Sequence, residues 1–182
     1  CNEVADLQAS VANDETLKLT WSYRNVGDYN LDSFVSISDL TPLAIHFGTS
    51  EGDVGYDPVV DGNSDRFITI GDITPIAVNF GSDLHHYRVE GAESATGGFT
   101  SLGDVAFSDS YQPDGFLMFW FTFAPGALRA FRVVPVDAAG VDGIVSTIET
   151  IELSPPEILL VTPLEGESGA VVTFSVSLTG TP

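Results

Sequence analysis

Two stretches of this chain place oxygen-bearing side chains at the same intervals, at positions 1, 3, 5, 9 and 12 counted from an aspartate. Oxygen is the ligand that hard divalent cations such as Ca²⁺ prefer in proteins. The spacing therefore predicts two twelve-residue loops, each able to surround one ion. The first loop contributes Asp28, Asn30, Asp32, Ser36 and Asp39, and the second contributes Asp61, Asn63, Asp65, Thr69 and Asp72.

The main chain is expected to complete each ligand set. A Ca²⁺ ion takes roughly six to eight oxygens, and the carbonyl of loop position 7 supplies one of them. Phe34 and Phe67 occupy that position. Three carboxylates around an empty centre would repel one another, so ordering each loop without a cation should be costly. We therefore predict two Ca²⁺ ions that are part of the fold.

The alternative is a pair of ordinary turns, because Asp, Asn, Gly and Ser also form turns that bind no ion. The agreement of the two stretches at five polar positions favours the cation sites. Position 8 agrees as well, since Val35 and Ile68 are both β-branched and apolar.

The duplicated pattern over residues 27–83 resembles the dockerin repeat, a loop–helix relative of the EF-hand that anchors secreted enzymes to cohesin domains. The resemblance implies calcium binding through the loop positions named above, and it names cohesin as a candidate partner. The EF-hand glycine at position 6 is replaced here by Ser33 and Arg66, which must make that sharp turn at some strain.

The partner-reading positions match the dockerin pattern less well. Positions 10 and 11 correspond to the dockerin contact pair, and a basic pair that usually follows in the helix is missing. The resemblance therefore supports calcium binding more strongly than cohesin binding. The residues at positions 10 and 11 are Ile37 and Ser38 in one copy and Ile70 and Gly71 in the other.

An apolar stretch with helical spacing follows each loop. Ser38 or Thr41 could cap the first helix, Pro42 suits its first turn and Gly48 its end, and Thr74, Pro75 and Gly81 repeat this arrangement. Two such short helices are expected to bury their apolar faces against each other. Those faces comprise Leu40, Leu43, Ala44 and Phe47 in the first copy and Ile73, Ile76, Ala77 and Phe80 in the second.

The chain on both sides of the repeats has the alternation of strands. Residues 17–23 alternate apolar and polar side chains with period two, which predicts a half-buried strand. The run at 116–123 is apolar at nearly every position, which predicts a central strand covered on both faces. Residues 144–153 predict a last strand. Several short strands separated by turn residues predict a mainly β antiparallel sandwich.

This strand series resembles a fibronectin type III domain over residues 1–26 and 84–153. Trp21 matches the tryptophan that ends the family's second strand, whereas Phe131 replaces its tyrosine near the sixth strand. The predicted fold is a fibronectin-III or immunoglobulin-like sandwich with the small α unit at 27–83 inserted between two strands. Residues 154–182 begin with a proline linker and predict either a partial immunoglobulin- or PKD-like module or a strand-exchange segment.

The charge of the chain limits its partners. Among 182 residues, 6 are Lys or Arg and 26 are Asp or Glu, for a net charge of −20. Such a surface repels nucleic acid and anionic lipid. No apolar run reaches the roughly 18 residues that span a bilayer, so no transmembrane segment is expected.

The single cysteine, Cys1, excludes an intramolecular disulfide within the chain. It is a candidate site of lipid attachment, as in a processed bacterial lipoprotein, or simply a terminal thiol. Calcium is abundant outside cells, and the loops therefore favour a secreted or cell-surface protein, with a bacterial origin suggested by Cys1.

No catalytic motif is present. The chain has no HExxH motif, no Gly-rich phosphate loop and no GxSxG elbow, so we predict that it is not an enzyme. The adjacent His85 and His86 are expected on opposite faces of a strand. Trp21, Trp120 and Tyr111 would stack on sugars if exposed, but in alternating strands they are expected in the core.

These observations predict a non-catalytic extracellular calcium-binding structural or interaction protein, part of a cell-surface assembly, adhesin or filament. The protein partner would be a copy of itself or another surface protein. A docking module that recruits a secreted enzyme to a cohesin scaffold is the first alternative. An accessory carbohydrate-binding domain is the second.

Overall fold

The computed structural model describes residues 4–13, 16–24, 26–114 and 116–152. The chain divides into two compact units, Cys1–Ile151 and Glu152–Pro182, and all the elements below belong to the first. The predictions for Cys1 and for the module or strand-exchange segment at residues 154–182 lie outside the described residues.

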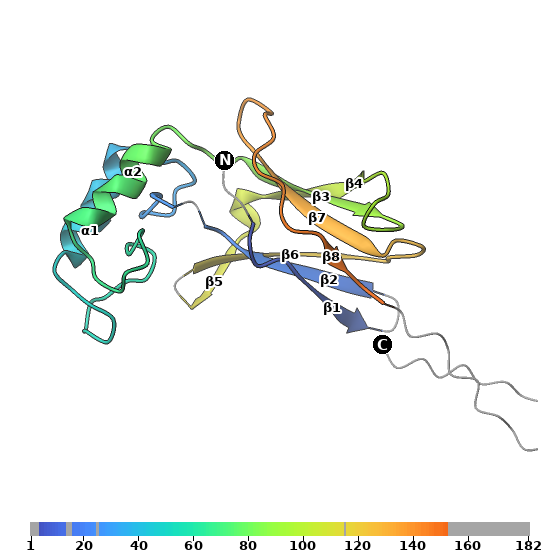
Figure 1. Ribbon diagram of the computed structural model, residues 1–182, viewed down its shortest axis with the longest axis horizontal. Coiled ribbons are helices and arrows are strands. Elements are labelled where there is room, and N and C mark those ends of the chain that lie inside the picture. Colours follow the sequence, from blue (N-terminus) through green and yellow to red (C-terminus); the bar gives the residue numbers. More distant parts are fainter. Residues whose placement is uncertain (1–3, 14–15, 25, 115, 153–182) are drawn as a thin grey trace, which may run out of the picture. The chain divides into compact units, whose positions relative to one another are not determined.

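The described part of the chain is mainly β, as predicted, with two antiparallel sheets and two short α-helices (Figure 1). One sheet has the strand order β1-β2-β6-β5, and the other has the order β4-β3-β7-β8. The strands are β1 (Gln8–Asn13), β2 (Thr16–Ser22), β3 (His86–Ala92), β4 (Thr100–Ala106), β5 (Tyr111–Asp114), β6 (Phe116–Phe123), β7 (Ala130–Val136) and β8 (Glu149–Thr150).

The two sheets share one hydrophobic core, which is the arrangement that a β-sandwich requires. Trp21 on β2 lies at its centre with no exposed surface. Its ring stacks on Phe119 of the same sheet at 6.0 Å and meets Tyr87 of the other sheet edge-on at 5.4 Å between ring centroids. The alternation of β2 places Leu17 and Leu19 on the same buried side.

The prediction that β6 is covered on both faces is wrong. The strand pairs with β2 on one side and β5 on the other, so it is central within its sheet. Phe119 is fully buried, but its neighbour Trp120 is 43% exposed. In the described part of the chain only the inner face of this sheet is covered, and an apolar run cannot reveal which of its faces has a second layer above it.

Over the described residues 144–152 the predicted strand is mostly irregular and reduces to the two-residue β8. Ser146 accounts for part of the difference. Its main-chain N–H donates to the Val133 carbonyl, while its hydroxyl accepts the Val133 N–H at 2.9 Å. A side chain thus replaces a main-chain acceptor beside β7, and the regular ladder starts again only at Glu149. Sequence analysis also missed the four-residue β5.

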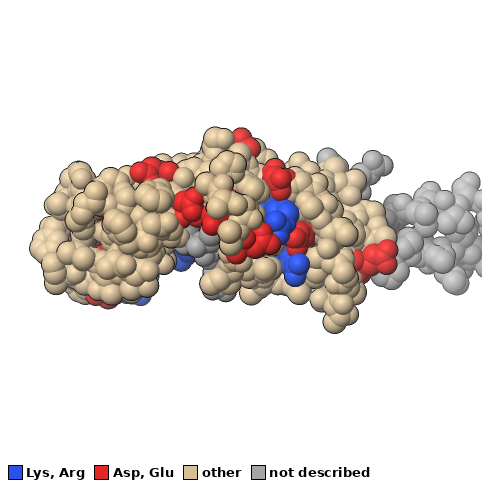
Figure 2. Space-filling view, turned by 90° about the horizontal axis from the view of Figure 1, so that it is seen from above, with Lys and Arg blue, Asp and Glu red and all other residues tan. Residues whose placement is uncertain are grey.

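Most basic side chains in the sheets are paired with acids. Glu90 is buried and accepts from Arg88 at 2.9 Å and from Arg132 at 2.7 Å, and Arg88 also holds Asp142 at 2.6 Å. Burial alone raises the pKa of Glu90, but the hydrogen bonds from the two arginines outweigh it and the pKa lies below its usual value. Figure 2 shows basic side chains on one face of the molecule lying among acidic ones.

Replacement of Tyr87 by Phe is expected to stabilise the protein by about 1 kcal/mol. Among the described residues the buried Tyr87 hydroxyl has no hydrogen-bond partner, so removing it removes an unsatisfied polar group while the ring contacts remain. Thermal unfolding followed by circular dichroism measures the change. Tyr111→Phe, at an exposed ring, is the matched control and should leave the transition in place. A lower melting temperature for Tyr87→Phe would contradict the prediction.

The segment between β2 and β3 forms a loop–helix unit, residues 27–83, that contains α1 (Leu40–His46) and α2 (Ile73–Asn79). Each helix follows a single 3-10 turn, Ile37–Asp39 or Ile70–Asp72. Ser36 and Thr69 are the N-caps of these turns, whereas Asp39 and Asp72 stand at the N-cap positions of the two α-helices. The predicted caps are therefore wrong in position, because each loop passes through a 3-10 turn before its α-helix begins.

The predicted apolar faces of the two helices are only partly buried. Leu43 and Ile76 lie in the core of the unit, whereas Phe47 and Phe80 at the helix ends are exposed. The rest of that core comes from the loops and the segments beside them, so the two helices do not need to cover each other fully. The core residues are Tyr29, Val35, Leu43, Val60, Ile68 and Ile76.

Candidate metal centre

The two predicted ligand loops, loop 1 (residues 28–39) and loop 2 (residues 61–72), have the same backbone conformation. Positions 4 and 6 are left-handed in both. The φ angle is 56° at Leu31 and 76° at Ser33 in loop 1, and 58° at Ser64 and 71° at Arg66 in loop 2. Non-glycine residues rarely adopt this conformation. The strained turn predicted at position 6 is therefore present in both loops.

The side chains of positions 1 and 3 converge on one main-chain amide. The N–H of Asp32 donates to Asp28 Oδ1 and to Asn30 Oδ1, at 3.1 Å each. In loop 2 the N–H of Asp65 donates in the same way to the residues at positions 1 and 3, at 3.1 Å and 3.0 Å. Both loops thus gather a carboxylate oxygen and an amide oxygen at the same point.

Position 12 closes each loop onto its own beginning. Asp39 Oδ1 accepts the N–H groups of Tyr29 at 2.8 Å and Asn30 at 3.2 Å, while its Oδ2 accepts that of Ser36 at 2.7 Å. Asp72 accepts from the equivalent positions 3 and 9 of loop 2. The carboxylate of position 12 thus holds the main chain of positions 3 and 9 in each loop.

Positions 5, 7 and 9 complete the comparison with the predicted ligand set. Asp32 at position 5 is exposed and accepts the N–H of Phe34 at 2.9 Å, so the peptide group of position 7 turns toward the loop. Phe67 and Asp65 repeat this contact at 2.9 Å. The Ser36 hydroxyl caps the following turn.

The two loops are related by reciprocal backbone pairing. Val35 at position 8 of loop 1 exchanges hydrogen bonds with Gly81 and Ser82, which follow α2. Ile68 at position 8 of loop 2 exchanges the same bonds with Gly48 and Thr49, which follow α1. Each loop is thus held by the end of the other repeat's helix, and neither is complete without the second repeat. Leu43 of α1 and Ile76 of α2 belong to the same small hydrophobic core.

Four of the six loop aspartates are buried. The exposed fractions are 1% for Asp28, 0% for Asp39, 7% for Asp61 and 0% for Asp72. No Lys or Arg in the described ranges forms an ion pair with any of them. Burial raises the pKa of Asp28 to about 6, with a smaller opposing effect from its hydrogen bonds. Buried carboxylates in proteins are normally paired with a cation or coordinate a metal.

These residues fit a hard cation by the chemistry of their donors, because every predicted ligand atom is an oxygen. Within the described residues, however, no group of three or more His, Cys, Asp or Glu side chains is arranged so that together they could hold a metal ion. The aspartate oxygens instead accept main-chain N–H groups. Only three members of each predicted ligand set are acids, and the remainder are an amide, a hydroxyl and a carbonyl.

Sequence analysis missed two tyrosines that contact the loops from outside. The Tyr23 hydroxyl donates to Asp28 Oδ2 at 2.5 Å, and the Tyr56 hydroxyl donates to Asp61 Oδ2 at 2.7 Å. The two tyrosines are 33 residues apart, the interval that also separates Asp28 from Asp61. Extending the repeat upstream of position 1 would have found them.

The prediction that the adjacent histidines lie on opposite faces of a strand is wrong. The Nδ1 atoms of His85 and His86 are 3.0 Å apart. Strand β3 begins at His86, so the alternation of strand side chains does not extend to His85.

The aromatic residues considered for sugar stacking separate into two groups. Trp21 is in the core as expected, but Trp120 and Tyr111 are exposed, contrary to expectation. The rings of Trp120 and Tyr111 are inclined by 74° to each other at 5.2 Å. They do not form the coplanar row on which the flat faces of a sugar chain would stack.

No protein-family model matches the chain, and no curated protein has a matching sequence. Among the described residues no helix has both the length and the apolar character needed to cross a membrane.

Proposed function

We propose that the loop–helix unit binds two Ca²⁺ ions, one in each loop, and that the protein is a non-catalytic extracellular structural or interaction protein of a bacterial surface. In this proposal the unit is a dockerin-like insertion in a fibronectin-III-like sandwich. The burial of Asp28, Asp39, Asp61 and Asp72 without a basic partner carries the proposal. Four buried carboxylates in one small unit need positive charge, and within the described residues no ion pair with Lys or Arg supplies it.

The repetition of the loop geometry supports the same proposal. Two stretches with different residues at positions 2, 4, 6 and 8 adopt the same left-handed turns and the same network of carboxylates and N–H groups. Left-handed conformations at Ser33 and Arg66 cost free energy, and such strain is retained where it serves a site. With calcium bound, Asp28, Asn30, Asp32, Phe34, Ser36 and Asp39 would hold one ion, and their equivalents in loop 2 the other.

Addition of calcium to metal-free protein is expected to raise its melting temperature and to show two bound ions per chain by isothermal titration calorimetry. A ligand that binds only the folded state stabilises it by about 2.7 kcal/mol when present at a hundred times its dissociation constant. The melting curve with excess chelator is the comparison, and Mg²⁺ at equal concentration controls for ionic strength. Equal melting curves with saturating calcium and with chelator would refute the proposal.

A second function, docking to a partner protein, is supported by the outer surface of the helices. Eight large apolar side chains of the loop–helix unit are more than half exposed, and six of them form three pairs related by the repeat. A purely structural spacer would bury such side chains against the sheets. The six are Ile37, Ile45 and Phe47 in the first repeat and Ile70, Val78 and Phe80 in the second.

Surface plasmon resonance with an immobilised cohesin panel tests this second function, with calcium and with chelator in parallel. Calcium-dependent binding that is lost on replacement of Ile37 and Ile70 by Asp would support docking. Absence of binding to any cohesin, with the calcium sites shown to be filled, would reject a cohesin as the partner and favour the structural function.

A further inference from the structure

Each loop has one side-chain contact to its first aspartate from outside the loop, and in both cases the donor is a tyrosine five residues upstream. The hydroxyl of Tyr23 or Tyr56 donates to Oδ2 of that aspartate. The same Oδ2 atom also accepts the N–H of position 6, at 2.8 Å in each loop. The tyrosine and the strained position 6 therefore hold the position-1 carboxylate from two sides.

This contact fixes the orientation of a carboxylate rather than supplying another ligand. Oδ1 of the aspartate accepts the N–H of position 5, so both oxygens are held and the carboxylate plane cannot turn freely. Groups that hydrogen-bond a metal-ligating side chain orient it, and their removal costs about ten- to a hundredfold in metal affinity. The tyrosine hydroxyl would act in this way at each loop.

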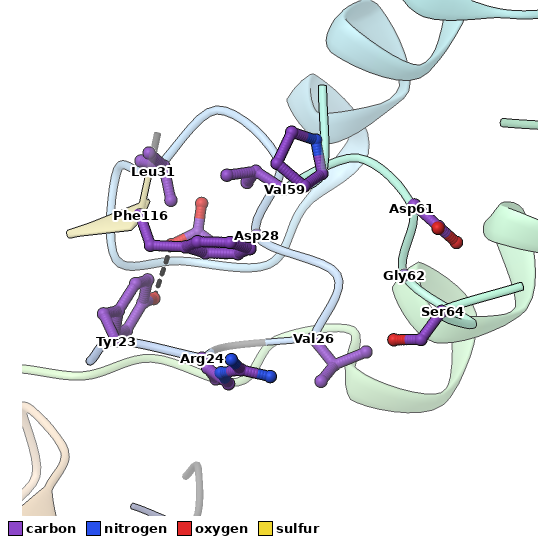
Figure 3. Close-up of a pocket in the computed structure, with 11 residues that line it drawn as sticks. Tyr23, Arg24, Val26, Asp28, Leu31, Val59, Asp61, Gly62, Ser64 and Phe116 are labelled. Carbon is purple, nitrogen blue, oxygen red and sulfur yellow. Dashed lines mark hydrogen bonds between the residues drawn. The ribbon is translucent and has the colours of Figure 1, made fainter. Parts of the chain in front are cut away.

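The two tyrosines differ in what holds them. Tyr23 directly follows β2 and belongs to the core shared by the two sheets, where its ring meets Phe107 edge-on at 5.1 Å. Leu31, at position 4 of loop 1, packs against the same core. Figure 3 shows the Tyr23–Asp28 hydrogen bond, with Leu31 and Phe116 lining the same pocket. Loop 1 is thus attached to the sheets by two side chains.

Loop 2 has no equivalent attachment among the described residues. Tyr56 lies within the loop–helix unit, between α1 and loop 2, and packs against the core of that unit rather than that of the sheets. Ser64, which occupies position 4 of loop 2, is exposed where Leu31 is half-buried. The repeat therefore conserves the hydroxyl contact between its two copies but connects only one copy to the sheets.

We propose that Tyr23 and Tyr56 are positioning residues for the two calcium sites, and that Tyr23 couples the site in loop 1 to the folding of the sheets. The inference rests on the proposed calcium binding. Coupling of this kind is reciprocal. If the folded sheets hold Tyr23 in place for Asp28, then an ion in loop 1 stabilises the sheets through that contact, whereas an ion in loop 2 acts on them only through its pairing with the first repeat.

The two tryptophans make the coupling measurable. The chain has 2, Trp21 and Trp120, and both lie in the sheets. Intrinsic tryptophan fluorescence of the full chain therefore reports unfolding of the sheets and not of the loop–helix unit. Calcium is expected to raise the unfolding midpoint seen by this fluorescence in the wild-type protein.

The experiment compares Tyr23→Phe with Tyr56→Phe, because each removes one hydroxyl and keeps the ring. Calorimetry is expected to show one of two ions bound about tenfold more weakly in each variant. The calcium-induced rise in the tryptophan midpoint should be reduced in Tyr23→Phe and retained in Tyr56→Phe. Tyr111→Phe, at an exposed tyrosine remote from both loops in sequence, is the control and should change neither quantity.

A second variant protects the test against a folding defect in Tyr23→Phe. Phe107→Leu loosens the packing around the Tyr23 ring but keeps the Tyr23 hydroxyl. Like Tyr23→Phe, it should lower the affinity of the protein for one of the two ions. Wild-type protein that binds two ions, with unchanged affinities in both tyrosine variants, would overturn the inference and leave the proposed function standing. Weaker calcium binding in Tyr23→Phe, with the calcium-induced rise in the tryptophan midpoint unchanged, would overturn the coupling. Failure of the wild type to bind calcium would overturn the proposed function itself.

Discussion

Replacement of Asp72 by Ala is expected to reduce the number of bound calcium ions from two to one and to destabilise the loop–helix unit by about 2–4 kcal/mol. Asp72 has no exposed surface, and its carboxylate accepts the N–H groups of Asn63 at 3.2 Å and Thr69 at 2.8 Å. Both donors would lose their partner. The substitution also removes the last predicted ligand of loop 2, so the metal-free and the calcium-bound protein should both lose stability.

Calorimetry gives the number of ions, and amide hydrogen exchange gives the stability of the loop–helix unit separately from that of the sheets. Asp53→Ala is a suitable control, because Asp53 lies in the same unit and accepts an N–H from Ser50 at 2.9 Å but is exposed. It should leave both ions bound. Two ions bound to Asp72→Ala with unchanged affinity would show that position 12 is not a ligand.

Replacement of Gly62 by Ala is expected to destabilise the loop–helix unit by about 1–3 kcal/mol. A Cβ atom added to Gly62 would lie 2.0 Å from the Tyr29 hydroxyl oxygen and 2.9 Å from its ring carbon Cζ. Tyr29 is buried in the core of the unit, and its hydroxyl donates to the Asp72 carbonyl at 2.7 Å. The ring therefore cannot move aside without breaking that hydrogen bond.

The double variant Tyr29→Phe with Gly62→Ala tests this mechanism. Removal of the hydroxyl removes the closest clash, so the double variant should be more stable than the sum of the two single changes predicts, by about 1 kcal/mol. Chemical unfolding of the four proteins completes the cycle. Gly98→Ala is the control, since its Cβ would meet no atom within 4 Å. Additive effects in the cycle would show that the cost at Gly62 arises elsewhere.

The Tyr29–Gly62 pair shows how far the repeat extends as a physical unit. Position 2 of the loops is tyrosine in one copy and glycine in the other, and the large side chain of one occupies the space left by the absent side chain of the other. A comparison of the two copies position by position sees only a mismatch. The complementarity appears once the two loops are folded against each other.

The sequence by itself determined the features whose partners lie close in the chain. The spacing of Asp28, Asn30 and Asp39 was enough to predict a closed loop, because the N–H groups that these side chains accept lie within ten residues of them. The period-two alternation in β2 was enough to predict its buried side. The strained position 6 followed from a missing glycine at a defined loop position.

Only the tertiary structure decided the features that depend on distant elements. The exposed face of β6, the irregular last strand and the exposed ends of α1 and α2 depend on which layers lie above them, and an apolar run carries no record of that. The contact of Tyr23 with Asp28 is local in sequence, yet its consequence is not. Tyr23 belongs to the core of the sheets, so whether it ties a predicted calcium loop to them depends on packing between segments far apart in the chain.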